Sequence, residues 1–211
     1  MAYYIFDLDG TLTNSAKGII NSIFYTLDYY QVEKPKIEDA QQLIGPPLLT
    51  TFQNLLPNGI SPHDAVKKYR EYYSEKGIFE NELYENVAST LQNLNQSNHT
   101  LALATAKPTY FAKIVLQHFN ILELFEIVVG SHLSGKRTDK KEIIYEVADQ
   151  LGWKTNYQNT FMIGDRASDI LGGKHHKLKT VGVLYGYGTQ KEINDSKPDF
   201  TINSFDYISN L

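Results

Sequence analysis

Two carboxylates separated by one residue, Asp7 and Asp9, end a short apolar run near the start of the chain, and Gly10 follows them directly. A carboxylate can attack phosphorus and form an aspartyl-phosphate when a cation offsets the nearby negative charge. We predict this role for Asp7. Asp9, two residues on, would project from the same side of an extended strand, where it can protonate a leaving alcohol and later deprotonate the attacking water. Gly10 allows a sharp turn whose amides could bind phosphate oxygens.

Other polar residues follow apolar runs in the same way. Thr105 stands near the end of the run TLALATA, and Asp165 follows NTFMIG, with Asp169 four residues later. Ligands of open parallel sheets bind at the carboxyl ends of strands, so these side chains would gather at one rim if their strands are neighbours. Carboxylates gathered in this way repel one another and raise some pKa values unless a cation is bound. Oxygen ligands beside a phosphate favour Mg²⁺.

The elements that must position these residues are short apolar or β-branched runs, which are typical of buried parallel strands. The runs are 3–9, 100–106, 125–131, 159–165 and 179–185. Amphipathic stretches at 108–120 and 139–152 predict helices between the later runs. Strand and helix alternate, which favours a doubly wound, parallel α/β sheet over a sandwich or a helix bundle.

One stretch breaks this alternation. From about residue 15 to residue 81 the apolar residues recur mostly at helical spacing, as in SAKGIINSIFYTLDYYQ. A helical insertion after the first strand is the simplest interpretation. We therefore predict an α/β core formed by residues 1–14 and 82–211, and a helical cap formed by residues 15–81.

The overall composition limits the classes of function. A chain of 211 residues can form one core domain and a smaller appendage. Its net charge of −4 is mild, and no basic block suggests a nucleic acid polymer as partner. The absence of cysteine excludes disulfides, a thiolate nucleophile and cysteine-based metal sites. Without a membrane-length apolar stretch or a signal-peptide pattern, we expect a soluble, cytoplasmic protein.

These residues together resemble the motifs of the haloacid dehalogenase-like (HAD) superfamily of phosphatases. The first motif, DxDGT, is found at 7–11, the second, a Thr or Ser at a strand end, at Thr105, and the fourth, GDxxxD, at 164–169. The resemblance implies a Rossmann-like HAD core in which Asp7 is the nucleophile and Asp9 is the general acid and base. It also implies a Mg²⁺ site with these ligands: Asp7, Asp9 through its backbone carbonyl, Asp165 and Asp169.

The third motif is a lysine that neutralises the phosphoryl group, and three residues could supply it. The segment GKRTDKKEII offers Lys136, Lys140 and Lys141, without the usual Lys-Pro pair. We assign the motif to Lys140, because it would lie at the start of the helix that its counterpart opens in relatives. The second motif departs from the common pattern, since Ala106 stands where Asn or Ser is usual. This change should cost a substrate contact and spare the chemistry.

Two further segments resemble one branch of the family, which contains phosphoglycolate phosphatases and 5′-nucleotidases with a helical cap. The segments are GVLYGYGTQKEI, in the last third of the chain, and LIGPPL at 43–48. The resemblance implies a cap loop at Gly45, Pro46 and Pro47 that reaches towards the substrate. It implies a Mg²⁺-dependent phosphatase acting on a small phosphate monoester, of the phosphoglycolate or nucleoside 5′-monophosphate class.

Two other functions are compatible with a phosphoryl site of this kind. A phosphomutase of the same fold would return the phosphoryl group to a sugar, and the sequence does not show which cap residues decide this. A receiver module, which is not an enzyme, also holds a phosphoryl group with an Asp cluster, a Thr and a Lys. Asp9 argues against the receiver, because a general base would hydrolyse a stored acyl phosphate. The individual phosphate ester and the oligomeric state stay open.

Overall fold

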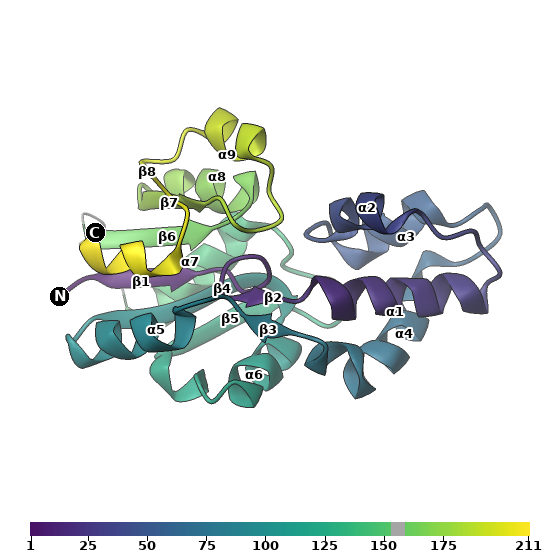
Figure 1. Cartoon of the computed structure of the whole chain (residues 1–211), viewed down its shortest axis with the longest axis horizontal. Coiled ribbons are helices and arrows are strands. Elements are labelled where there is room, and N and C mark those ends of the chain that lie inside the picture. Colours follow the sequence, from purple (N-terminus) through teal and green to yellow (C-terminus); the bar gives the residue numbers. More distant parts are fainter. Residues whose placement is uncertain (153–158) are drawn as a thin grey trace. The chain divides into compact units, whose positions relative to one another are not determined.

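The protein is described by a computed structural model that covers residues 1–152 and 159–211 (Figure 1). It divides into two compact units, and the short strand β3 spans the boundary between them. The first unit, here called the core, contains residues 1–14 and 83–211. The second unit, here called the cap, contains residues 15–82.

Within the described residues, the core is built on a parallel six-stranded sheet. Its strand order is β5-β4-β1-β6-β7-β8, so β1 lies in the interior between β4 and β6. The strands are β1 (Tyr3–Phe6), β4 (Thr100–Pro108), β5 (Ile127–Ser131), β6 (Thr160–Gly164), β7 (Lys179–Val183) and β8 (Phe200–Ile202). The predicted doubly wound α/β sheet is confirmed.

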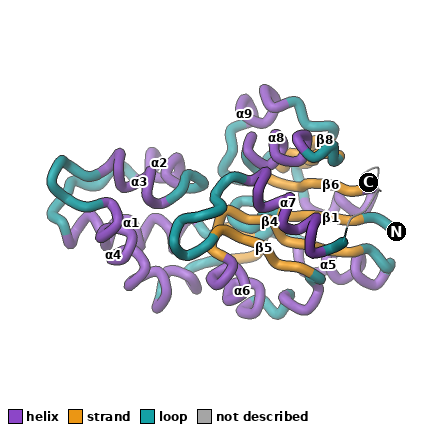
Figure 2. The backbone as a smooth tube through the Cα atoms, turned by 180° about the vertical axis from the view of Figure 1, so that it is seen from behind, coloured by secondary structure: helices purple, strands orange, loops and turns teal. Residues whose placement is uncertain are grey.

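The strand order explains why helices cover both faces of the sheet. The chain runs outwards from β1 through β4 to β5, and then crosses back to β6, β7 and β8. Because such crossovers are right-handed, helices before and after the reversal lie on opposite faces. Figures 1 and 2, which view opposite sides, show helices over both faces. The helices are α5 (Val87–Gln96), α6 (Thr109–His118), α7 (Lys140–Gln150), α8 (Ala167–His175) and α9 (Gln190–Ser196), with 3-10 segments η3 (Leu122–Leu124) and η5 (Phe205–Asn210).

The central strands are held by an apolar core between the sheet and α7. Ile5 of β1, Met162 of β6 and Ile144 of α7 are fully buried there and belong to one packed cluster. Asp139 caps α7, because its side chain accepts a hydrogen bond of 2.9 Å from the backbone amide of Lys141. This cap fixes the first turn of α7, where Lys140 lies.

The cap is helical and has its own core. Its elements are α1 (Ala16–Tyr29), α2 (Ile37–Ala40), η1 (Gln41–Leu43), α3 (Leu48–Leu55), α4 (Pro62–Glu75) and η2 (Gly77–Phe79). Ile23, Leu27 and Phe52 are fully buried. Short strands β2 (Thr13–Asn14) and β3 (Glu82–Leu83) pair where the chain passes from one unit to the other and returns.

The first strand is shorter than the predicted run 3–9. β1 ends at Phe6, although the Asp7 amide continues the ladder by donating to Ile163 O at 2.9 Å. The carbonyl of Leu8 then accepts hydrogen bonds from the amides of Thr11, Leu12 and Thr13 at 2.9 to 3.2 Å, which closes a tight turn. Asp9 therefore lies in a turn and not in a strand, so the alternation expected of an extended strand does not place its side chain.

Candidate active site

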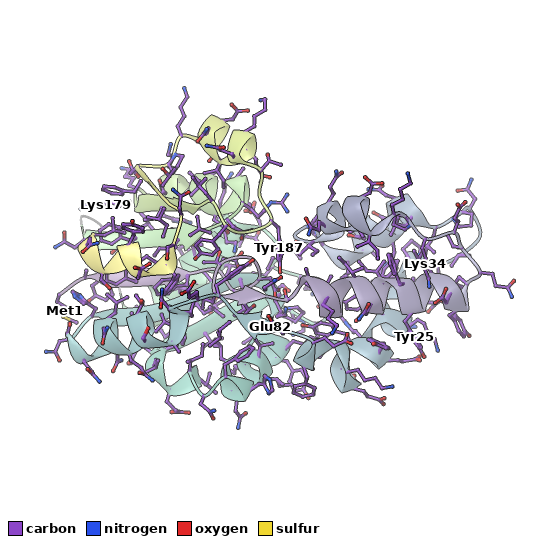
Figure 3. The ribbon with its side chains drawn as sticks, viewed as in Figure 1. Met1, Tyr25, Lys34, Glu82, Lys179 and Tyr187 are labelled. Carbon is purple, nitrogen blue, oxygen red and sulfur yellow. The ribbon has the colours of Figure 1, made fainter. Side chains whose placement is uncertain are left out.

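Three carboxylates meet at the carboxyl ends of two adjacent strands. Asp7 follows β1, Asp165 follows β6, and Asp169 lies in the first turn of α8. One oxygen from each lies within 4.8 Å of the others, and all three residues are buried. In Figure 3, Lys179 labels the start of β7 and Tyr187 labels the loop beyond the end of that strand, so the two residues mark the two ends of the parallel sheet. The predicted meeting of these three residues at one rim is observed.

The electrostatics of this cluster fit a bound cation. Burial, together with the charges of Asp169 and Asp7, raises the pKa of Asp165 to about 8. Burial and the charge of Asp7 raise the pKa of Asp169 to about 6, although Lys140 opposes this shift. Within the described chain, neither Asp7 Oδ1 nor Asp169 Oδ1 has a well-directed hydrogen bond. Buried carboxylate oxygens in this state are the donor set that a hard divalent ion such as Mg²⁺ prefers.

Lys140 supplies positive charge to the same cluster. Its Nζ lies 2.8 Å from Asp169 Oδ1 and 3.1 Å from Asp7 Oδ1, and donates a hydrogen bond of 2.9 Å to Ala104 O. Burial alone would lower the pKa of Lys140, but the negative charges of Asp169 and Asp7 raise it above its ordinary value. Lys136 and Lys141, the other two candidates, are exposed. The geometry therefore favours Lys140 as the third motif.

Asp9 has a different environment from the three clustered carboxylates. Both of its oxygens accept hydrogen bonds of 2.6 Å from Lys107 Nζ, across 98 residues of sequence. The Asp9 side chain is 18% exposed, so it is more accessible than Asp7. Asp7 is thus a buried carboxylate within the cluster, whereas Asp9 is a more accessible carboxylate beside the cluster. Coordination of a metal through the Asp9 backbone carbonyl stays a prediction.

The turn after β1 is shaped by Gly10. Its φ of +86° is in the left-handed region that favours glycine, and a Cβ there would lie 2.3 Å from Asp165 Oδ2. The Gly10 amide donates to Thr13 O at 2.8 Å, within the turn. Thr11 Oγ1 donates to Asp165 Oδ1 at 3.2 Å. Gly10 therefore brings the turn against Asp165, and its predicted contact with phosphate stays a prediction.

The second predicted motif lies at the end of β4. Thr105 is buried, and its Oγ1 accepts a hydrogen bond of 3.2 Å from the Lys107 amide. Ala106, between them, is half-buried. The roles predicted for Thr105 and Ala106 in phosphate binding stay predictions, as do those of Gly45 and Pro46 in the cap.

Two features of the site were not predicted from the sequence. One is Lys107, and the other is the loop after β7. The Tyr187 amide donates to Asp165 Oδ2 at 2.8 Å, and a Cβ on Gly186 would lie 2.3 Å from both Asp165 Cβ and Gly10 O. The signal was present in the GYG sequence, because glycine is the residue that permits such close backbone approach. This loop therefore packs against Asp165 and donates a hydrogen bond to its side chain.

The cluster predicts that the stability of the fold depends on pH when no cation is bound, and that a bound cation removes this dependence. In the unfolded chain Asp165 ionises near pH 4, whereas in the folded protein without metal its pKa is raised to about 8. The folded state then binds more protons between these values, so stability falls as the pH rises through this window. We expect urea unfolding in chelator to show a decrease on the order of a few kcal/mol from pH 5 to pH 8.5.

Mg²⁺ should restore this stability, because a ligand of the native state raises its unfolding free energy. Asp165→Asn should flatten the pH profile in chelator and abolish the response to Mg²⁺. An Asp165→Asn protein with the same pH profile as the wild type would refute the assignment of this effect to the cluster.

Comparisons with known proteins agree with this geometry. Residues 4–183 match the model of a family described as haloacid dehalogenase-like hydrolase. A 5′-nucleotidase of Pseudomonas aeruginosa is 35% identical over 195 residues, which are 92% of this chain and 87% of that protein. A pyrophosphatase PpaX of Halalkalibacterium halodurans is 32% identical over 201 residues, 95% of this chain and 91% of that protein.

Another relative bears a different name, and a solved structure shows the same fold. The tyrosine-protein kinase PtkA of Mycobacterium tuberculosis is 35% identical over 184 residues, which are 87% of this chain but 62% of that protein. The crystal structure of a putative phosphatase from Clostridium difficile is 40% identical, with a TM-score of 0.90, and covers 99% of this chain and 97% of that one. The family match spans most of the sequence and includes the motifs at 7–11, Thr105 and 164–169. The chain therefore belongs to the haloacid dehalogenase-like hydrolases.

Proposed function

We propose that the protein is a Mg²⁺-dependent phosphatase that hydrolyses a small phosphate monoester through an aspartyl-phosphate on Asp7. One observation carries the proposal: the buried Asp7 belongs to a carboxylate cluster, while the more accessible Asp9 is held separately beside it. A nucleophile and a proton donor require these two different environments. The phosphatase names of relatives support the same class of enzyme.

In the first stage, an Asp7 oxygen attacks the phosphorus of the ester. A new bond forms between Asp7 and phosphorus, the bond from phosphorus to the ester oxygen breaks, and Asp9 gives its proton to that oxygen. Lys140 offsets negative charge on Asp7 and on the phosphoryl oxygens, which is the main source of catalysis in phosphoryl transfer. The alcohol leaves with the proton that Asp9 carried.

In the second stage, Asp9 acts as the base. It takes a proton from water, the water oxygen bonds to phosphorus, and the bond from phosphorus to Asp7 breaks. Phosphate is released, Asp7 returns as a carboxylate, and Asp9 is again protonated. One residue can serve both stages because the leaving alcohol and the attacking water occupy the same side of phosphorus.

The metal would be held by Asp7, Asp165, Asp169 and the backbone carbonyl of Asp9. When bound, Mg²⁺ supplies positive charge that polarises the phosphoryl group and neutralises the carboxylate cluster. The chain's own groups maintain that cluster, since Tyr187 donates to Asp165 and Lys140 contacts two of the carboxylates.

Substrate selection would fall to residues 15–81, with Gly45 and Pro46 in a loop that reaches the substrate. Phosphoglycolate and nucleoside 5′-monophosphates are the classes favoured by the sequence, and the 5′-nucleotidase relative supports the second. No helix in residues 1–152 and 159–211 has the length and apolar character to cross a membrane. The cytoplasmic location and the absence of nucleic acid partners remain part of this proposal.

A panel of phosphate esters tests the proposal. We expect phosphate release from at least one member of a set containing nucleoside 5′-monophosphates, phosphoglycolate, sugar phosphates and pyrophosphate. Release should require Mg²⁺ and stop in chelator, because the carboxylates otherwise repel the substrate. No release from a folded protein, or transfer of the phosphoryl group to a sugar hydroxyl or to a tyrosine instead of water, would contradict hydrolysis.

A further inference from the structure

A cavity lies at the end of the sheet opposite the carboxylate cluster. Its volume of about 320 Å³ is in the range of small-molecule sites. Its walls come from the starts of β1, β6 and β7, from the end of α5 and from the turn before β4. In Figure 3, Lys179 labels this end of the sheet, whereas Tyr187, whose amide contacts Asp165, lies at the other. The cavity is therefore separate from the candidate active site.

Part of the cavity wall is a row of side chains that crosses the sheet. Tyr4, Phe161 and Lys179 are in register on β1, β6 and β7. The rings of Tyr4 and Phe161 stack with their centroids 5.2 Å apart, and Lys179 Nζ lies 5.0 Å from the Phe161 centroid. Because β6 lies between β1 and β7, these neighbours cover both faces of the Phe161 ring. The ring can offer a ligand only its edge, which carries partial positive charge.

Two further side chains of the cavity are hydrogen-bond donors. His99 Nδ1 accepts a hydrogen bond of 3.0 Å from the Ala2 amide, so the proton of the neutral ring is on Nε2. The His99 ring also packs edge-on against Tyr4, with the centroids 5.4 Å apart. Burial raises the pKa of Tyr4, so its hydroxyl keeps the proton that it can donate. The cavity therefore combines these two donors with the ammonium group of Lys179.

The fold does not use these donors. Across residues 1–152 and 159–211, the Tyr4 hydroxyl, His99 Nε2 and Lys179 Nζ form no hydrogen bond or ion pair, and neither do the lining side chains of Asn93 and Ser97. None of the lining side chains that the structure describes is acidic. Tyr4 is only 4% exposed, and a buried hydroxyl without a partner costs free energy that a ligand would recover.

We propose that this cavity is a binding site for a phosphate group, either free or in a small ester. Lys179 supplies the positive charge, and Tyr4, His99, Asn93 and Ser97 supply neutral donors. A phosphate can accept hydrogen bonds from several donors at once through three or more oxygens, whereas a carboxylate has two. A stacked aromatic ligand is disfavoured, because both faces of the Phe161 ring are covered. The site does not depend on the proposed phosphatase function.

Calorimetric titration of the whole chain with inorganic phosphate tests the proposal. The titration is done in chelator, because the metal-free carboxylate cluster then repels anions from the candidate active site. We expect saturable binding that is at least about tenfold tighter than the binding of acetate, since each hydrogen bond to a charged group contributes about this much. Titration with glycerol 3-phosphate shows whether the free anion or an ester is the tighter ligand.

Variants then assign the binding to the cavity. Tyr4→Phe removes one hydroxyl and keeps the stacked ring, and Lys179→Met removes the charge and keeps most of the side-chain length. Each should weaken phosphate binding about tenfold or more. Lys113→Met, which removes the charge of an exposed lysine on α6, is the matched control and should bind phosphate as the wild type does. Circular dichroism verifies that each variant is folded.

Three results would overturn the inference. The first is a folded wild type that binds neither inorganic phosphate nor glycerol 3-phosphate. The second is acetate binding as tight as phosphate binding, which would remove the reason to assign a phosphate group. The third is wild-type phosphate binding by both Tyr4→Phe and Lys179→Met, because the anion would then bind elsewhere on the protein.

Discussion

Replacing Asp7 by Asn is expected to reduce phosphate release by a thousandfold or more, roughly the loss seen when an enzyme loses its nucleophile. The amide has nearly the same shape as the carboxylate, but it does not form an acyl phosphate. Because Asp7 is buried next to Asp165 and Asp169, losing its charge should leave the fold intact and reduce repulsion in the metal-free cluster. Steady-state phosphate release, with circular dichroism to verify folding, measures both effects.

The control for this substitution is Asp195→Asn, which changes an exposed carboxylate that pairs with Lys191 on the surface. It should leave activity and stability within experimental error of the wild type, since exposed ion pairs contribute little. Wild-type turnover in the Asp7→Asn protein would exclude a covalent intermediate on this residue.

Replacing Lys140 by Met is expected to impair both stability and turnover. The Lys140 side chain is 4% exposed and its ammonium group contacts two buried carboxylates. Removing one partner of a buried ion pair leaves uncompensated charge and costs roughly 3–5 kcal/mol. Turnover should fall about 10²–10³-fold, as when one group that stabilises transition-state charge is removed. Urea unfolding in chelator and initial rates in Mg²⁺ measure the two losses.

The neighbouring lysines provide matched controls for this prediction. Lys136 and Lys141 are exposed, so Lys136→Met and Lys141→Met should change the unfolding free energy by less than about 0.5 kcal/mol and leave turnover unchanged. These three variants also decide among the three lysines that the sequence offered. If either exposed variant loses activity while Lys140→Met keeps it, the assignment of the third motif to Lys140 is wrong.

Most of the sheet could be predicted because its strands are buried on both faces. Ile5, Met162 and Val181 stand in continuous apolar runs, and each run was long enough to stand out from its surroundings. The edge strand β8 (Phe200–Ile202) was not predicted, because two of its three residues are exposed and the segment lacks a continuous apolar pattern. β8 is a strand because it pairs with β7, and the local sequence pattern does not reveal this pairing.

The contents of the site were less predictable than its location. The carboxylates stand at strand ends, and parallel strands bring such ends together. The contact of Lys107 with Asp9 instead depends on the turn after β1 and on the irregular end of β4, which join residues 98 positions apart. The support of Asp165 by Tyr187 likewise depends on the path of a loop. Contacts of this kind follow from tertiary structure and leave no periodic signal.

The central claim is that Asp7 carries the phosphoryl group, and chemical trapping tests it most directly. Borohydride reduces an acyl phosphate to an alcohol, so a phosphorylated Asp7 becomes homoserine, which peptide mass spectrometry identifies by position. The best substrate of the ester panel is added with Mg²⁺, and the reaction is trapped during turnover. We predict homoserine at position 7 that requires substrate, in the wild type and, accumulating more slowly, in Asp9→Asn, because loss of the acid and base slows both stages. Homoserine at another position, or sustained turnover with none at position 7 in either protein, would contradict the account.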